Sequence, residues 1–560
     1  MLNPVVQWLL RLPRLQQATL AVCFAAPIFT WYLRSGSAPP EAYRIFQRLF
    51  FFNDNAGSWA MLAALLLALS VRGLQDAVAR GAEWVGENPG WACAASFVAL
   101  AAGARIVYLA HPLSMDEYAP WMQAHALAQG QLTARYPPEL IDWIVPKWFQ
   151  NVFIFVNRGS GDAISGYWPG LALAMAPFAR IDLAWCLNPA LSVLALALIG
   201  DIAARAGGGA RARGWAMLAA LASPQFTVNA MSFYAMPGLL ALNLLFLWLL
   251  LRGRWQSAFV AGWVGAWALV MHNPVPHTLM AIPCVIWLAL DRRRWPCLAA
   301  LALGYLPVAV CLGVGWSLLM TEIRTAGVAA TAAAAGAAAS TGSFLDAVLA
   351  SLRIFRLPTA ELVEARWFAL WKTWIWACPG LLLLPFLIAR RDLAQRLLLA
   401  ALVLTFLFYF LVPFDQGHGW GFRYLHPVWA LFPIAGGLWM ASTPAAARFG
   451  AVAVAAGLLA TPVFLWQTHA FIAGAVAQRF EPPPAGRWVV FVAQQPGRYS
   501  GDLVQNAPGQ ERVLRLLSRG EGADRELMSA RFPGAERVQH DQRGSLWRVP
   551  ESLPASGTAR

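Results

Sequence analysis

The sequence predicts an α-helical membrane protein that crosses the bilayer many times. Of its 560 residues, 59% are hydrophobic and only 12% are charged, whereas about a quarter of the residues of an ordinary soluble protein are charged. Apolar runs recur from near residue 16 to near residue 467. They are long enough for spanning helices and do not alternate like the strands of a membrane barrel.

We divide the chain into N-terminal transmembrane helices at 1–90, a transmembrane core region at 91–470 whose external loop is 111–183, and a small external α/β domain at 481–560. About thirteen spans fit the apolar runs, and interfacial helices are expected in the external loop. The expected spans are 16–33, 57–74, 91–110, 184–201, 213–230, 234–251, 256–271, 275–290, 297–318, 368–389, 395–413, 425–442 and 449–467.

The net charge of +14 is explained by membrane topology, and we expect no nucleic-acid partner. With a cytoplasmic N-terminus, every turn assigned to the inside is basic, as at Arg72, Arg205, Arg292 and Arg396, which agrees with the positive-inside rule. The same threading places the loop 111–183 outside. The composition, rich in Arg and Ala and poor in Lys, is typical of a high-GC bacterium. We therefore expect a multi-pass protein of the bacterial inner membrane, with the periplasm on its outer side.

The C-terminal region changes character near Glu481, where charged and polar residues replace the apolar runs. The apolar stretch 488–493 predicts a β-strand. Farther upstream, the alanine-rich stretch 329–339 predicts a loop or a marginal helix, followed by an amphipathic stretch at 344–356. The C-terminal region is therefore expected to project from the outer face as a small α/β domain.

The letters SMDE at 114–117 fit the capping box S-x-x-E directly after an apolar run. In this motif Ser114 caps a helix and Glu117 reaches back to the backbone N–H of the capping residue. The helix is expected to run from Met115 toward Gln129, with Gly130 as its stop signal, and to lie on the bilayer surface. Asp116 is then a free carboxylate, or both acids simply stabilise the start of the helix.

The loop that follows is long and rich in polar and aromatic residues. Loops longer than about 15 residues are usually functional or disordered, and abundant aromatic residues argue against disorder. We therefore expect a functional site in the external loop.

Several blocks of the sequence resemble one membrane-enzyme superfamily in content and order. They are MDEYAPWMQAHALAQGQL, SGYWPGLALAMAPF, LNPALSVLALALIGDIAARAG, ASPQFTVNAMSFYAMPGLLALNLLFLWLLLRG and GHGWGFRYLHPVWALFPIAGG. Together they are similar to the GT-C superfamily of integral-membrane glycosyltransferases, and especially to bacterial proteins related to protein O-mannosyltransferases and aminoarabinose transferases. The resemblance covers about residues 91–467, so region 91–470 is expected to be catalytic.

The resemblance implies a lipid-linked sugar donor, usually a polyprenyl-phosphate sugar, and a catalytic acidic motif in the first external loop. Asp116 matches the catalytic carboxylate of the superfamily and Glu117 matches its neighbour. The expected reaction is transfer of the sugar to an acceptor hydroxyl with inversion, Asp116 acting as general base. This sequence departs from the pattern because two additional helices precede the acids, and the acceptor does not follow from the resemblance.

Cationic groups on the outer side are candidates for binding the donor phosphate. They are Lys147, Arg158, His272, His418 and Arg423. Alternatives stay open, because Lys147 and Arg158 would also suit lipid headgroups, Arg423 with Tyr424 would suit an interfacial anchor, and His272 would suit a hydrogen-bonded turn. The glycines of GHGWGFRY would allow a ligand close to the backbone or a flexible turn. Aromatic candidates for sugar or acceptor binding are Tyr118, Tyr167, Trp168 and Tyr424.

The sequence identifies no cofactor with certainty, and we assign no residue as a metal ligand. A divalent metal stays open because Asp116, Glu117 and the histidines offer ligands, but no compact spacing such as H-E-x-x-H occurs. The expected partners are a polyprenyl-phosphate sugar, the lipid bilayer and an acceptor glycan, lipid or protein. The alternative function is a transporter or flippase of lipid-linked sugar, and a third is an assembly protein whose helices only display the C-terminal domain.

Overall fold

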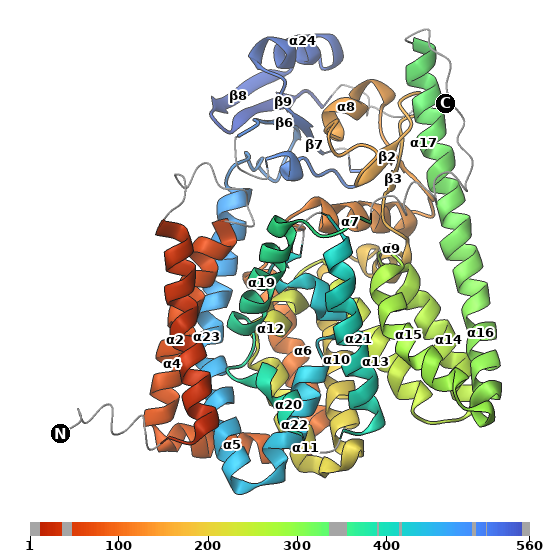
Figure 1. Ribbon diagram of the computed structural model, residues 1–560. Coiled ribbons are helices and arrows are strands. Elements are labelled where there is room, and N and C mark those ends of the chain that lie inside the picture. Colours follow the sequence, from red (N-terminus) through yellow and green to blue (C-terminus); the bar gives the residue numbers. More distant parts are fainter. Residues whose placement is uncertain are drawn as a thin grey trace.

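The computed structural model describes residues 12–35, 48–334, 355–388, 391–413, 417–495, 500–510 and 512–551. A bundle of helices forms its larger part, and a smaller part with strands covers one end of this bundle (Figure 1). The helices of the bundle are α2 Arg14–Ser35, α4 Asn55–Ser70, α5 Arg72–Glu87, α6 Pro89–Ile106, α10 Leu187–Ala203, α11 Gly209–Leu221, α12 Pro224–Met231, α13 Met236–Leu250, α14 Trp255–Val270, α15 Val275–Ala289, α16 Trp295–Val308, α17 Gly315–Ala334, α19 Ala360–Ile375, α20 Leu384–Leu387, α21 Leu393–Phe408, α22 Leu431–Ser442 and α23 Pro444–Val476.

The polytopic helical class is as expected, whereas the count of thirteen spans is not confirmed. Among the described residues, five helices are long and apolar enough to cross a membrane, and seven if each of two bent pairs counts as one span. Three shorter apolar helices, α9 Gly170–Ala179, α15 and α22, accompany them.

The first bent pair corrects the predicted span 57–74. Helix α4 ends at Ser70, Val71 has an extended conformation, and α5 departs at 95°. Helix α5 carries charge along its length and buries only a narrow apolar face, so it lies across the lower end of the bundle, where charged groups reach water (Figure 1).

Two more predicted spans are broken at prolines. Helix α11 ends at Leu221 and α12 begins at Pro224, which splits the expected span 213–230. The expected span 368–389 is interrupted after α19, where Pro379 is followed by Gly380 in the left-handed region at φ 75°. Proline cannot donate a helical hydrogen bond, and glycine accepts positive φ without strain.

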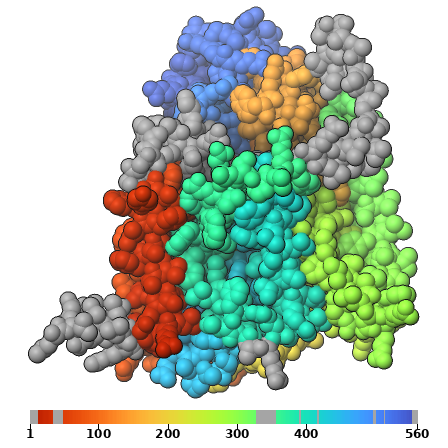
Figure 2. All heavy atoms as spheres, in the orientation of Figure 1, coloured from red at the N-terminus to blue at the C-terminus, as the bar shows by residue number. Residues whose placement is uncertain are grey.

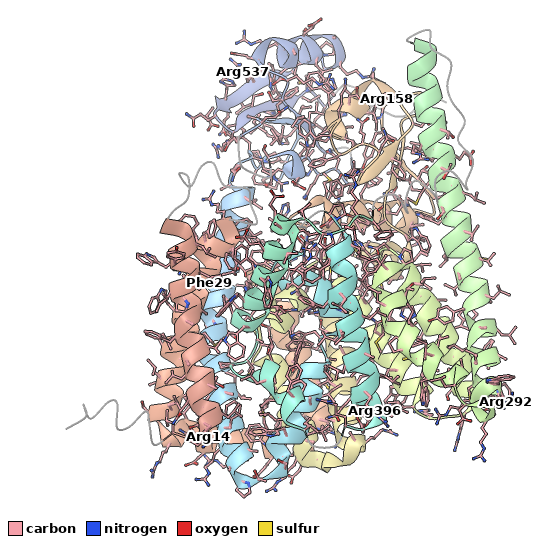
Figure 3. All side chains as sticks on the ribbon, viewed as in Figure 1. Arg14, Phe29, Arg158, Arg292, Arg396 and Arg537 are labelled. Carbon is pink, nitrogen blue, oxygen red and sulfur yellow. The ribbon has the colours of Figure 1, made fainter. Side chains whose placement is uncertain are left out.

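Arginines mark the lower end of the bundle. Figure 3 places Arg14, Arg292 and Arg396 at this end, whereas Arg158 and Arg537 lie at the opposite end. The three lower arginines flank apolar helices, the arrangement that the positive-inside rule associates with the cytoplasmic side.

The loop 111–183, which the sequence predicts to be external, folds over the upper end of the bundle. Helix α7 lies across the bundle axis there, beneath the C-terminal strands (Figure 1). Three short strands of this loop form an antiparallel sheet in the order β1-β3-β2. The elements of the loop are α7 Met115–Ala128, β1 Ala134–Arg135, α8 Ile141–Ile144, β2 Ile154–Val156, β3 Asp162–Ser165 and α9 Gly170–Ala179.

The C-terminal residues form a four-stranded mixed sheet in the order β7-β6-β9-β8. The central strand β6 pairs in parallel with β7 and antiparallel with β9, and it confirms the strand expected at 488–493. Its elements are β6 Arg487–Val492, η11 Gly501–Leu503, β7 Val513–Leu517, α24 Glu521–Arg531, β8 Glu536–Asp541 and β9 Gly544–Val549.

The alanine-rich stretch is helical where the structure describes it, since α17 continues to Ala334. Residues 335–354, which hold the remainder of this stretch and most of the expected amphipathic segment, lie outside the described residues.

Candidate active site

The site is built around the first turn of α7. This helix begins at Met115 and ends at Ala128, and Gly130 follows with φ 75°, so the helix expected from the sequence is confirmed. Ser114 is the N-cap residue and has an extended backbone conformation. Asp116 and Glu117 both lie in the first turn, yet their surroundings differ completely.

Glu117 is fully buried and holds the helix start against the bundle. Its carboxylate accepts hydrogen bonds from the Tyr108 hydroxyl at 2.9 Å, the Leu113 backbone N–H at 2.7 Å and the Phe233 backbone N–H at 2.8 Å. Burial raises the pKa of Glu117 to about 7, although these three donors favour the ionised form. Glu117 therefore has a structural role.

The predicted capping box is wrong, because its two side chains bond to other partners than expected. Glu117 reaches the backbone of Leu113, not that of Ser114, and Ser114 makes no side-chain capping bond. The Ser114 hydroxyl lies 3.1 Å from the Tyr234 hydroxyl instead. The tertiary contact with Tyr234 takes the place of the local capping bond.

Asp116 has side-chain partners from distant parts of the chain. The Tyr167 hydroxyl donates to Oδ1, and Arg423 Nη1 lies 2.9 Å from Oδ2. The side chain of Asp116 is 18% exposed. Burial would raise the pKa of this carboxyl, but Arg423 and the Tyr167 hydroxyl together lower it below its ordinary value. Asp116 is thus ionised and paired, where the sequence had suggested a free carboxylate.

Arg423 reaches Asp116 from a tight hairpin formed by β4 His418–Gly419 and β5 Gly421–Phe422. A Cβ atom at Gly419 would lie 3.2 Å from Arg423 Cδ and Nε, so this glycine gives the arginine room. The guanidinium also lies 4.5 Å from the centre of the Tyr234 ring. At Gly419, the close approach predicted for a ligand is occupied by Arg423.

His272 adjoins the same group. Its ring stacks on Tyr167 with centroids 4.1 Å apart, and its backbone carbonyl accepts from the Trp168 N–H at 3.0 Å. Burial lowers the pKa of His272 to about 4, although Asp116 opposes this shift. His272 is therefore neutral near pH 7. Its Nδ1 is buried with no hydrogen-bond partner among the described residues.

The structure brings together Asp116, Tyr167, His272 and Arg423, with Trp168 adjacent. It places Lys147 and Arg158 elsewhere, because both pair with Asp142. The Asp142 carboxylate lies 3.6 Å from Lys147 Nζ and 3.0 Å from Arg158 Nε. A role for these two cations at the donor phosphate stays a prediction.

Three other predicted residues pack within the protein. His418 lies against Phe422, with ring centroids 5.5 Å apart, and Tyr424 stacks on Tyr409 at 3.9 Å. Tyr118 is 1% exposed, and its hydroxyl donates to the Asn506 carbonyl at 3.0 Å. These contacts give each residue a structural role, and their predicted ligand roles stay untested.

Sequence reasoning missed Tyr234 and Asp502. Tyr234 lies at the 112° bend between α12 and α13, and a polar residue at an interrupted apolar run was the available signal. The Asp502 carboxylate accepts from the Met115 N–H at 2.6 Å, and no local pattern links these two residues. No group of three or more His, Cys, Asp or Glu side chains suited to a metal occurs within the described part of the chain.

Comparison with known proteins gives a match at the level of structure. No protein-family model and no curated protein matches the sequence. The crystal structure of ArnT from Cupriavidus metallidurans bound to undecaprenyl phosphate superimposes with a TM-score of 0.50 and 14% identity, over 83% of this chain and 98% of that one.

The chain has the fold of ArnT. The apo structure of ArnT from the same organism matches over 82% of this chain and 98% of that one, with a TM-score of 0.49 and 14% identity. The match to the complex with undecaprenyl phosphate confirms the resemblance in fold that the sequence blocks suggest.

Proposed function

We propose that this protein is a membrane glycosyltransferase, which moves a sugar from a polyprenyl-phosphate donor to an acceptor hydroxyl on the periplasmic side of a bacterial inner membrane. The observation that carries the proposal is the partly exposed Asp116–Arg423 pair at the start of α7. The ArnT fold supports it, because the ArnT structure contains undecaprenyl phosphate.

The pair supplies the two charges that the reaction needs. The acceptor oxygen forms a bond to the anomeric carbon while the bond from that carbon to the phosphate oxygen breaks, which inverts the sugar. Asp116 takes the hydroxyl proton and the leaving lipid phosphate takes the bonding electrons. Arg423 stabilises the negative charge that develops on this phosphate.

The low pKa of Asp116 constrains the timing of proton transfer. A carboxylate whose pKa lies below its ordinary value is a weak base toward a free alcohol. The acceptor hydroxyl becomes acidic only as its oxygen bonds to the anomeric carbon, so the proton moves late. Tyr167 holds one oxygen of Asp116, which orients the carboxylate toward the acceptor.

The test is an assay with purified protein in liposomes, using an undecaprenyl-phosphate sugar as probe. Mass analysis of envelope glycans and lipid-linked sugars from cells with and without the protein identifies the sugar and acceptor to supply. The proposal expects free undecaprenyl phosphate to accumulate in the presence of the acceptor, with wild-type protein but not with Asp116→Asn. Movement of intact lipid-linked sugar across the bilayer without its consumption would instead establish the flippase alternative.

A further inference from the structure

The C-terminal region packs against α7, the helix that carries Asp116. Segment 500–510 lies along α7, and its residues Asp502, Gln505 and Asn506 are all at most 6% exposed. In Figure 2 the C-terminal residues and the first external loop form one continuous surface above the bundle. This region was expected to be an external appendage, yet its loop is packed against the candidate site.

Three hydrogen bonds bracket Asp116 along the chain. Before it, the Gln505 side chain donates to the Pro112 carbonyl at 2.6 Å, and the Met115 N–H donates to Asp502 Oδ1 at 2.6 Å. After it, the Tyr118 hydroxyl accepts from the Asn506 N–H at 2.9 Å. One short segment therefore holds the backbone before Asp116 and the Tyr118 side chain after it.

A fourth bond anchors the far end of the helix. The Gln129 side chain donates to the Pro508 carbonyl at 2.6 Å. The segment thus follows α7 from its first residue to the residue after its last turn, and the helix cannot shift along its axis without breaking several bonds together.

The Asp502 contact supplies a hydrogen-bond acceptor to the start of α7. The first N–H groups of an α-helix have no partner within it, and an N-cap side chain usually serves one of them. Ser114 makes no such bond, because its hydroxyl faces Tyr234. Asp502 supplies an acceptor from outside the helix, at the Met115 N–H.

We propose that the C-terminal region contributes to the site and that Asp502 is a positioning residue. Asp502 fixes the first turn of α7, so that Asp116 contacts both Arg423 and Tyr167. The inference rests on the proposed function for its kinetic consequence. A displacement of about 1 Å at a reacting group costs on the order of 10²-fold in rate, so the bond has a large effect without touching substrate.

Two substitutions separate positioning from a role for the charge. Asp502→Ala removes the acceptor of the Met115 N–H. Asp502→Asn retains an oxygen at the same place, so it should still hold the helix. Asp524→Ala is the matched control, because Asp524 is an equally buried carboxylate, 5% exposed, whose bonds to Ser518 and Arg519 stay within the C-terminal region.

The first readout is hydrogen exchange of backbone amides in the full-length protein, which requires no activity. Asp502→Ala should raise exchange at Met115 and the following turn by at least about tenfold, because local opening becomes easier. Strand β6 should stay protected. Asp502→Asn and Asp524→Ala should leave the first turn of α7 protected. Unchanged exchange in Asp502→Ala, in a variant that keeps β6 protected, would overturn the inference.

The second readout is turnover of the undecaprenyl-phosphate sugar. Asp502→Ala should lower kcat by about 10²-fold with little change in KM for the donor, and Asp502→Asn should recover most of it. Equal losses in both variants would overturn positioning in favour of a charge effect. Absence of transfer by the wild-type protein would end the proposed function, while the exchange experiment would still decide the role of Asp502.

Discussion

Arg423 Nη1 lies 2.9 Å from Asp116 Oδ2, although 307 positions separate the two residues. The Arg423 side chain is 4% exposed and that of Asp116 is 18% exposed. The pair therefore combines a nearly buried cation with an anion that solvent still reaches. In the proposed reaction, an acceptor approaches the carboxylate while the guanidinium keeps its place.

Asp116→Asn should lower sugar transfer by about 10²–10⁴-fold, the usual contribution of a general base. It should also destabilise the protein by about 1–3 kcal/mol, because the nearly buried Arg423 loses a charged hydrogen-bond partner. Transfer kinetics and thermal unfolding in detergent measure the two effects. Adding Arg423→Gln should restore stability without restoring transfer, and recovery of transfer by the double variant would contradict the assigned roles.

Tyr167→Phe should weaken catalysis while keeping the ring that stacks on His272. The lost hydroxyl is one of the groups that lower the pKa of Asp116, so this pKa should rise. In the proposed mechanism Asp116 acts in its ionised form, so the acidic limb of the profile of kcat against pH should move to higher pH. An acidic limb that stays at its wild-type position would show that the profile does not report Asp116.

Glu117→Gln should lower the stability of the protein more strongly than it lowers the rate of sugar transfer. Glutamine offers one acceptor oxygen where the carboxylate offers two, so at least one of three donors is left facing an amide nitrogen, at about 1–3 kcal/mol for a buried group. Thermal unfolding tests this against Glu83→Gln, since Glu83 is exposed and should change stability by less than about 0.5 kcal/mol. A Glu117→Gln protein of normal stability but without transfer would give Glu117 a chemical role.

Asp502 predicts a specific dependence of stability on pH. Burial raises its pKa to about 8, although the Met115 N–H opposes this. The folded protein then keeps a proton that the unfolded chain releases above about pH 4, so stability is lost as pH rises toward 8. Asp502→Asn should therefore gain at least about 1 kcal/mol relative to wild type between pH 5 and pH 9. A difference independent of pH would refute the shifted pKa.

The membrane orientation predicts opposite labelling of two introduced cysteines. Ser160 is exposed in the external loop, and Leu290, which is 83% exposed, lies beside the basic turn at Arg292. In a Cys311→Ser background, which removes an exposed native thiol, a charged reagent should label Ser160→Cys in intact spheroplasts and Leu290→Cys only after permeabilisation. Labelling of Leu290→Cys from outside would reverse the proposed topology.

Local sequence patterns predicted several helices and strands but not the contacts between them. The bounds of α7 follow from the polar residues before it and the glycine after it, and β6 follows from its apolar stretch. The breaks at Pro224 and Gly380 were missed, because a hydropathy window averages a single proline or glycine into a long apolar run. A structural role for Glu117 was foreseen, yet its partners were not.

The site itself depends on distances that no spacing encodes. Topology placed Asp116 and Arg423 on the same side of the membrane without saying that they touch. The bond between Asp502 and the Met115 N–H lay farther beyond sequence reasoning, because an isolated acid in a polar C-terminal region resembles any solvated residue. Both partners of this bond are buried, and their burial is known only from the structure.

The bond between Met115 and Asp502 spans 387 positions of the chain, which has a consequence for biosynthesis. The ribosome makes α7 well before Asp502, so the first turn of this helix is completed only after the helices from α9 to α23 have been made. A polypeptide that stops before Asp502 would keep these helices but lack the acceptor of the Met115 amide, and it is expected to be inactive and sensitive to proteases.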